Sequence, residues 1–292
     1  MATLSKKIDF AIIMSVKNAN PNGDPLNGNR PRTDYEGLGE MADVCLKRKV
    51  RDRLIERYTS LKDENEKSGQ AIFVQSDDRK VDGETSLRNR AESETNGLGK
   101  KAFSANAKKD ETAKLACAKW LDVRAFGQVF AFGKSNDADG VSIPIRGAVT
   151  IQSAFSVEPV SVSSTQITKS VSGEGDGTKR GSDTMGMKHR VDSGIYVTYG
   201  SMNPQLAERT GFSDDDAAII KAILPRLFEN DASSARPEGS MAVRNVIWWE
   251  HNSKAGQYSS AKVHKTLTVK ADGSYSFTTN LDGLKPEEID GF

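Results

Sequence analysis

The chain has 292 residues, with 41 Lys and Arg against 40 Asp and Glu, a net charge of +1 and a sequence pI of about 7.7. This length is enough to bury a hydrophobic core, and the balanced charge excludes a uniformly basic protein, so any nucleic-acid surface must be local. Two widely spaced cysteines, Cys45 and Cys117, exclude a disulfide framework or a zinc site. Since no apolar run approaches the about 20 residues of a membrane span, we expect a cytoplasmic protein without a membrane partner.

The first predicted element is a strand over residues 8–16. Apolar residues occupy every second position of it, which is typical of a half-buried sheet strand: Ile8, Phe10, Ile12, Met14 and Val16. The segment Asn18–Arg32 follows and is rich in Asn, Gly and Pro. We expect it to be a loop that presents backbone groups and side-chain amides and forms neither strand nor helix.

The next predicted element is a basic helix over residues 40–60. Leu46, Val50, Leu54 and Tyr58 repeat every fourth residue and predict one buried face. Within residues 47–57, six basic residues against Asp52 and Glu56 give this helix a local excess of four positive charges. A charge run often means only a solvated face, but the preceding loop suits phosphate oxygens. The combination favours phosphate binding.

The middle of the chain alternates short elements with polar segments. Residues 71–75 predict a short strand, and the polar stretch 76–110 predicts an insertion without a core of its own. A helix over residues 111–121 follows, with Gly127 as a stop signal. Beyond it, Val149, Ile151, Phe155 and Val157 predict a strand with these side chains on one face.

Residues 159–191 predict a long hairpin with a glycine-rich tip. Met185 and Met187 are expected to be exposed at its base, where an apolar side chain can wedge between bases. His189 stands between Lys188 and Arg190. Three interpretations of this triplet stay open: a solvated hairpin, an RNA contact, and a general acid or base for RNA cleavage.

The C-terminal part predicts a helix after residue 213, a strand and a hairpin. Ser213 is expected to cap the helix, whose first turn holds three Asp that complement the helix dipole. Residues 243–249 predict an apolar strand, and Asp272-Gly273 predicts the turn of the hairpin over residues 266–277. The order of elements predicts an α+β fold with an antiparallel sheet and helices on one face, as a single domain over residues 1–292.

No motif predicts a cofactor, a metal site or a catalytic residue. Gly133-Lys134-Ser135 resembles part of a phosphate-binding loop, but such a loop needs glycine at position 128, which is Gln. None of the three histidines lies near a Cys or at i,i+4 to another His.

Four segments in order resemble a known family. They are Asn20–Pro25, Asp43–Arg51, Asp122–Gly127 and Thr184–His189, and together they resemble the backbone subunit of type I-C CRISPR Cascade complexes, a Cas-seven-type branch of the RAMP superfamily. The resemblance implies an RRM-like, modified ferredoxin-like sheet called the palm. It also implies a fingers region at residues 76–110 and a thumb hairpin at residues 159–191. At position 187 the family pattern leads us to expect Arg where this chain has Met.

The resemblance implies a non-catalytic CRISPR RNA-binding subunit that acts in antiviral defence. Several copies form a helical filament along the guide RNA, kink it with their thumbs and present it for pairing with target DNA. Its other partners are further Cascade subunits, of the Cas-five type and the large subunit. The residues expected to bind RNA are Asn20, Asn22, Arg30, Arg32, Lys47, Arg48, Arg51, Arg146, Thr184, Met185, Lys188, His189 and Arg190.

Two enzymatic alternatives belong to the same superfamily. One is a CRISPR RNA-processing endoribonuclease that uses His189, and the other cleaves target RNA through a loop Asp such as Asp24 or Asp34. Both Asp residues are more typical of turn formers.

Overall fold

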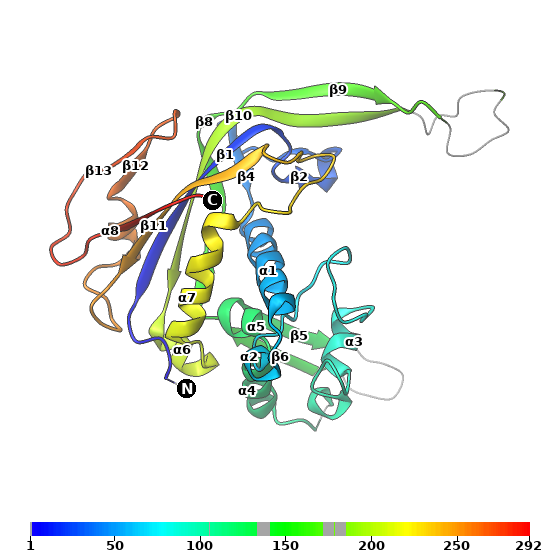
Figure 1. Cartoon of the computed structure of the whole chain (residues 1–292), viewed down its shortest axis with the longest axis vertical. Coiled ribbons are helices and arrows are strands. Elements are labelled where there is room, and N and C mark those ends of the chain that lie inside the picture. Colours follow the sequence, from blue (N-terminus) through cyan, green and yellow to red (C-terminus); the bar gives the residue numbers. More distant parts are fainter. Residues whose placement is uncertain (1, 105, 133–140, 172–177, 179–184) are drawn as a thin grey trace.

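One antiparallel sheet of eight strands forms the centre of the structure, a computed structural model that describes residues 2–104, 106–132, 141–171, 178 and 185–292. The strand order is β14-β11-β1-β10-β8-β4, and β7 and β9 pair with β10 as well. The strands are β1 (Ile8–Ala19), β4 (Leu38–Met41), β7 (Val149–Ile151), β8 (Ala154–Pro159), β9 (Val162–Thr168), β10 (Met185–Met202), β11 (Met241–Glu250) and β14 (Glu287–Asp290). Together with the helices packed on it, the sheet confirms the predicted α+β class (Figure 1).

Strand β1 lies in the middle of the sheet and is buried on both faces. It pairs with β10 and β11, so that Phe10 lies between Gly200 and Trp248. Position 200 requires glycine, because a Cβ there would lie 2.2 Å from Cζ of Phe10. The prediction of a half-buried strand was wrong, since Ala11 and Ile13 on the opposite face are fully buried too.

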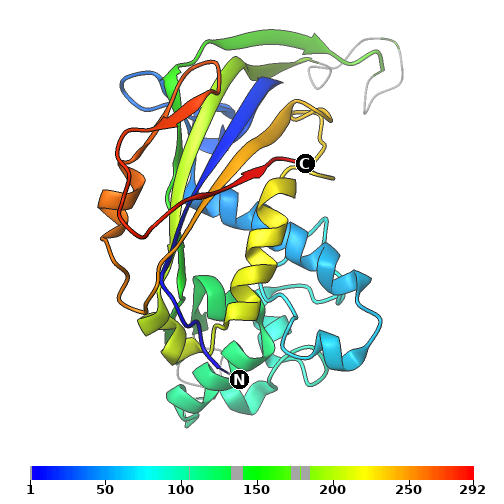
Figure 2. The same ribbon diagram turned by 60° about the vertical axis from the view of Figure 1, so that its left-hand side comes forward.

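Each face of the sheet has its own cover. On one face α1 (Asp43–Ser60), α6 (Pro204–Thr210) and α7 (Asp214–Ile223) enclose the larger hydrophobic cluster, which includes Phe10 and Leu46. On the other face lie α8 (Ser260–His264) and the hairpin of β12 (Leu267–Val269) and β13 (Tyr275–Phe277) (Figure 2). These elements pack around Trp249. This second cover corrects the expectation of helices on one face of the sheet.

Helix α1 carries the predicted apolar stripe. Leu46, Val50 and Leu54 are buried, as predicted from their occurrence at every fourth position. The helix begins at Asp43 rather than at residue 40, because Leu38–Met41 forms the edge strand β4.

The strand predicted around residues 149–157 is broken in two. Val149 and Ile151 of β7 are buried, but Phe155 of β8 is 40% exposed while Ser156 is buried. The side-chain alternation therefore shifts by one residue at the break between β7 and β8. The prediction placed Phe155 on the same face as Ile151, and this was wrong.

A helical lobe, residues 64–132 and 141–146 in the described part, forms a second unit beside the sheet. It contains α2 (Glu64–Lys67), α3 (Leu87–Glu92), α4 (Lys109–Lys119), α5 (Leu121–Phe126), β5 (Gly127–Phe132) and β6 (Val141–Arg146). Its core is aromatic, since Phe130 lies 5.0 Å from Phe73 and 5.2 Å from Phe103 between ring centroids. Phe103 lies in the polar stretch 76–110, so the expectation that this stretch contributes no core is corrected.

Two smaller predictions concern the same lobe. Residues 71–75 do not form the predicted strand; Ala71 makes only an isolated parallel bridge to Trp120. Gly127 ends α5 with a φ of 80°, as predicted for a stop signal.

The segment Asn18–Arg32 is more regular than predicted. β1 continues to Ala19, and β2 (Gly23–Asp24) pairs with β3 (Arg30–Pro31) around a 3-10 helix at Pro25–Asn27. Gly28 and Asn29 take positive φ values of 57° and 59° at the turn. The expectation of a loop with no strand was wrong, because these two left-handed residues close a short hairpin.

The predicted long hairpin is present as an arm that extends from the sheet (Figure 1). We call β9 and residues Met185–Val191 of β10 the projecting hairpin. Its strands pair from Val191 opposite Val162 to Met185 opposite Thr168. Val191 is buried and lies at the base, so Met185 lies at the far end of the described pairing and not at the base as predicted.

The C-terminal predictions hold. Ser213 and Asp216 form a capping box at the start of α7, and β11 covers the apolar segment. At the turn between β12 and β13, Asp272 accepts a hydrogen bond from the backbone N of Ser274, and Gly273 has a φ of 84°. Over the described ranges, no helix combines the length and hydropathy that crossing a bilayer would require.

Candidate nucleic-acid interface

The cations of α1 are largely neutralised within the protein. Arg51 Nε lies 2.9 Å from Asp122, Lys47 Nζ 2.8 Å from Asp43, and Lys49 pairs with Asp231. Arg53 and Arg48 also contact carboxylates. The local excess of positive charge seen in the sequence is therefore balanced by acidic residues, several of them distant in sequence, and α1 does not present a free basic face.

Burial explains why several of these pairs are structural. Lys49 is 3% exposed, and burial lowers the pKa of its amine despite the adjacent Asp231. Asp52 is also 3% exposed, and burial raises the pKa of its carboxyl above the usual value although Arg48 and Arg79 lie nearby. The Lys49–Asp231 pair is therefore structural and not accessible to a ligand.

Arg51 is the clearest case among the predicted RNA-binding residues of α1. Its side chain is only 13% exposed, and the guanidinium carbon lies 5.2 Å from the centre of the Phe126 ring. Arg48 is different, because it is half exposed and its contacts to Asp52 and Asp78 are long, 3.8 and 3.5 Å. Arg48 therefore stays available at the surface, whereas Arg51 is a scaffold residue.

The asparagines of the first loop also serve the scaffold. Asn20 is 3% exposed and donates from Nδ2 to the carbonyl of Asn29 at 2.7 Å. Asn22 Oδ1 accepts from the backbone N of Ala42 at 2.9 Å, just before α1. These contacts fix the β2–β3 hairpin against the start of α1, so the expected direct role of Asn20 in RNA binding does not fit its burial.

The two loop aspartates are turn formers, as expected. Asp24 Oδ1 accepts from the backbone N of Leu26 at 3.2 Å, and Asp34 Oδ1 accepts from the backbone N of Glu36 and Leu38 at 2.9 Å each. Arg32 also lies 3.4 Å from Asp24. Both carboxylates are thus engaged in local structure.

A different set of cations is unpaired. Lys17, Arg30 and Lys188 have no ion-pair partner among the residues that the structure describes, and we call them the free cations. Lys17 lies on β1 opposite Ser193, where the projecting hairpin joins the sheet. Arg30 lies on β3, which packs against β10.

The projecting hairpin has two chemically different faces. Met185, Met187 and His189 alternate with Lys188 and Arg190, so the two groups point to opposite faces. Met185 and Met187 are 60% and 55% exposed. The sequence placed these five residues in one group, and the strand pairing separates them into an apolar face with one histidine and a basic face.

His189 and Arg190 each make one side-chain contact. Ser164 Oγ lies 2.8 Å from Nδ1 of His189, directly across the hairpin. Arg190 Nε lies 4.0 Å from Asp192, a loose pair that leaves Arg190 46% exposed. No second titratable side chain is recorded in contact with His189 within the described ranges, so a partner acid or base for cleavage is not part of the described site.

The remaining predicted residues lie elsewhere. Arg146 is exposed on β6 of the helical lobe, away from the projecting hairpin (Figure 1). Thr184 lies outside the described residues. In the parts of the chain that the structure describes, no group of three or more His, Cys, Asp or Glu is placed to hold a metal ion.

Sequence reasoning did not single out three exposed residues. Lys17 ends the alternating pattern of β1, and Leu26 and Tyr35 are 98% and 109% exposed on two tight turns. The only sequence signal for the latter two was an apolar residue next to turn formers, Asp24 and Asp34.

The fold is thus that of an α+β protein with one antiparallel sheet, a helical lobe and a two-faced projecting hairpin. A family model described as CRISPR-associated protein Cas7 matches residues 6–285. The chain therefore belongs to the Cas7 family.

Individual relatives are distant. The CRISPR-associated protein Cas7 of Haloferax volcanii is 27% identical over 294 residues, which cover 97% of this chain and 80% of the relative. A chain of a "CRISPR RNA-guided surveillance complex, pre-nicking" aligns with a TM-score of 0.49 and 18% identity, over 83% of this chain and 75% of its own. A chain of a "CRISPR RNA-guided surveillance complex" aligns with a TM-score of 0.47 and 18% identity, over 92% and 77%.

Proposed function

We propose that the protein is a non-catalytic, CRISPR RNA-binding backbone subunit of a Cascade surveillance complex, of the type I-C kind whose motifs it resembles. In this proposal the central sheet is the RRM-like palm, residues 76–110 contribute to the fingers and residues 159–191 form the thumb of a single domain. Membership of the Cas7 family supports the general role.

The observation that carries the proposal is the two-faced projecting hairpin. Exposed Met185 and Met187 on one face suit insertion between bases, and Lys188 and Arg190 on the other suit the flanking phosphates. A subunit that holds any guide sequence must grip phosphate and ribose and leave base edges free for pairing with target DNA.

Several copies would then bind along one guide RNA, with Cas-five-type and large subunits as further partners. A near-neutral protomer suits such an assembly, because uniformly basic copies would repel one another. Each thumb would kink the RNA at a regular interval and leave the nucleotides between kinks available to the target.

The contacts of the side chains refine which residues grip the RNA. We assign phosphate contacts to the free cations and to Arg32 and Arg190, with Arg48 and Lys47 of α1 as a second, weaker group. Arg146, Thr184 and His189 remain proposed RNA contacts. Asn20, Asn22 and Arg51 are assigned to the scaffold.

The experiment is to purify the protein after co-expression with a CRISPR repeat–spacer transcript and measure its size and nucleic-acid content. We expect a large assembly that contains RNA and falls to small species on RNase treatment. A monomer that neither retains nor binds the transcript would contradict the proposal. Met185→Ala with Met187→Ala should leave assembly near normal and reduce the chemical reactivity of the flipped nucleotides.

The nuclease alternative is tested with the same material. The protein is incubated with a labelled repeat RNA, with and without magnesium, alongside His189→Ala and the matched variant Ser164→Ala. We expect no specific cut in any sample. A cut that is lost in His189→Ala and retained in Ser164→Ala would replace the backbone proposal by the endoribonuclease.

A further inference from the structure

Helix α5 lies between the two hydrophobic clusters and belongs to both. Leu121 and Ala125, one helical turn apart, are buried in the cluster of the sheet, while Val123 is buried in the aromatic cluster of the helical lobe. Phe126 is partly buried against the cluster of the sheet, and the remaining two positions are charged, Asp122 at 0% and Arg124 at 7% exposure. Two charged side chains therefore occupy the centre of the joint between sheet and lobe.

Asp122 ties the lobe to α1. Its Oδ1 accepts from the backbone N of Phe73 at 2.7 Å, and its Oδ2 accepts from the backbone N of Val74 at 3.1 Å. Oδ2 also accepts from Nε of Arg51 on α1 at 2.9 Å. The carboxylate of Asp122 thus holds the backbone at Phe73 and Val74 in place relative to the middle of α1.

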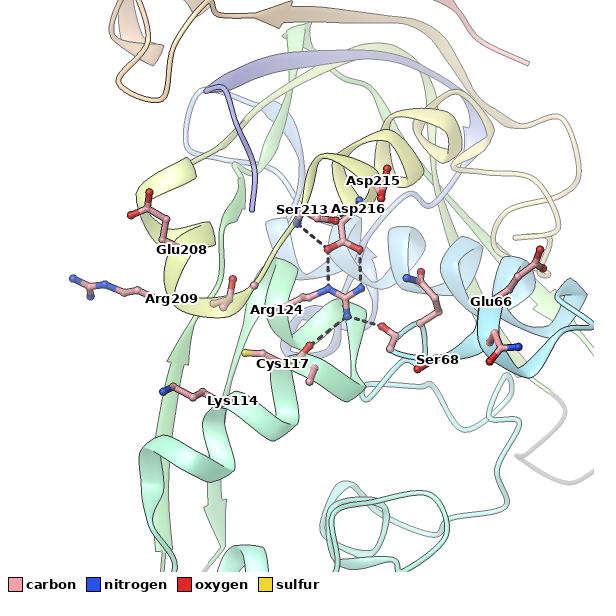
Figure 3. Close-up of a pocket in the computed structure, with 16 residues that line it drawn as sticks. Glu66, Ser68, Lys114, Cys117, Arg124, Glu208, Arg209, Ser213, Asp215 and Asp216 are labelled. Carbon is pink, nitrogen blue, oxygen red and sulfur yellow. Dashed lines mark hydrogen bonds and ion pairs between the residues drawn. The ribbon is translucent and has the colours of Figure 1, made fainter. Parts of the chain in front are cut away.

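Arg124 ties the same short helix to α7. Its Nε and Nη2 donate to the two carboxylate oxygens of Asp216 at 2.8 and 2.7 Å, and its Nη1 donates to the carbonyls of Gly69 and Cys117. Asp216 in turn accepts from the backbone N of Ser213 at 3.0 Å. Figure 3 shows these bonds at a cavity of about 560 Å³ between α4, α6 and α7.

We propose that Asp122 and Arg124 are positioning residues that set the orientation of the helical lobe on the sheet and, through it, the place of segment 73–80 beside α1. Buried ion pairs add little net stability compared with apolar residues, but they favour one arrangement because any other leaves charges unpaired. The two pairs hold α5 to α1 and to α7, two of the helices that cover the same face of the sheet. The apolar contacts alone would tolerate sliding.

The fixed lobe has a direct effect at the candidate interface. Segment 73–80 carries Arg79, whose Nη1 lies 3.3 Å from Glu56 on α1 and whose Nη2 donates to the carbonyl of Asn230. The same segment forms one wall of a cavity of about 580 Å³ that Arg48 also lines. Asp122 therefore acts on the surface of α1 through this segment.

The first test uses the free protein without RNA. Hydrogen exchange is measured for the backbone amides of Phe73 and Val74 in wild type, Asp122→Asn and the matched variant Asp110→Asn, whose carboxylate is exposed on the same lobe. Asparagine keeps one acceptor oxygen and places an N–H group at the position of the other, so we expect exchange at one or both of these amides to rise about tenfold or more. Asp110→Asn should leave them unchanged.

Arg124→Lys gives a second, milder variant in case Asp122→Asn unfolds. Lysine keeps the charge but loses the paired contacts to Asp216 and the carbonyl of Gly69, so we expect faster exchange at the start of α7 and around residue 69. Unchanged exchange at these places would overturn the proposal. So would a uniform rise over the whole chain in both variants, because it would show loss of stability without loss of orientation.

The second test rests on the proposed function and can fail separately. Nuclease protection of a long guide RNA should show a regular repeat with wild type and Asp110→Asn. With Asp122→Asn the salt dependence of binding should stay unchanged, because no phosphate contact is lost, while the repeat becomes irregular. A regular repeat with the variant would contradict positioning; no protection with wild type would contradict the proposed function and leave the exchange result to decide the inference.

Discussion

The free cations lead to a prediction whose size follows from counting phosphates. The variant Lys17→Gln, Arg30→Gln, Lys188→Gln removes three side chains that have no ion-pair partner in the described part of the chain. For a single-stranded nucleic acid each neutralised phosphate contributes about 0.7 to the slope of log K against log salt, so the slope should become less steep by about 2. When salt is raised from about 50 to about 200 mM, both proteins lose affinity for RNA, and the fold loss should be about 20 times smaller for the variant than for wild type.

The assay is fluorescence anisotropy of a labelled single-stranded RNA over a series of salt concentrations. The control variant is Lys47→Gln, whose cation already contacts Asp43 at 2.8 Å. Because a cation held by a carboxylate releases few counterions from RNA, we expect a smaller change in slope per residue for the control. Equal changes per residue in the two variants would refute the assignment of phosphate contacts to the free cations.

Three further predictions concern stability. Phe130→Ala should lower the free energy of unfolding by about 3–5 kcal/mol in urea titrations, because its ring is fully buried in the lobe core, and a loss below about 1 kcal/mol would contradict that packing. Gly200→Ala should cost about 1–3 kcal/mol, since the new Cβ would clash with the ring of Phe10; a melting temperature equal to wild type would refute this. Burial lowers the pKa of His264 below 6.5 in the folded protein. As the pH falls, this histidine therefore takes up its proton in the unfolded chain before it does so in the folded protein, and the free energy of unfolding should decrease below about pH 6.5. The melting temperature of His264→Gln should decline less over this range, and identical declines would contradict the account.

Periodic segments could be predicted from the sequence because their signal is local. The stripe of Leu46, Val50 and Leu54 and the hairpin that ends at Val191 both follow from spacing along one element. Capping by Ser213 is equally local. Such features depend only on residues that are close together along the chain, so they can be recognised without knowing the fold.

Features that depend on distant residues were missed. The free charge of α1 was overestimated because Asp122 and Asp231, which pair with Arg51 and Lys49, lie far along the chain. The second face of β1 was missed because Asp9 reads as a solvated residue, although it is fully buried and hydrogen-bonded to His251 at 2.9 Å.

The candidate site shows the same division. The sequence predicted the projecting hairpin and the exposure of its methionines correctly, because both follow from composition and length, but it placed the methionines at the wrong end of the pairing. The sequence analysis did not place the methionines on one face and Lys188 and Arg190 on the other, because the direction of each side chain is known only once the pairing register of the strand is known. The charged pair on α5 was noticed only as a motif, with no physical role.

Strand β10 runs through 18 residues from Met185 to Met202, a length of about 60 Å at the usual rise of a strand. The outer part belongs to the projecting hairpin and the inner part pairs with β1 from Val191 opposite Ala19 to Met202 opposite Ile8. A force applied to the arm is therefore carried into the sheet through the hydrogen bonds of the β1–β10 ladder. The arm is thus the extension of a strand that is anchored in the centre of the sheet.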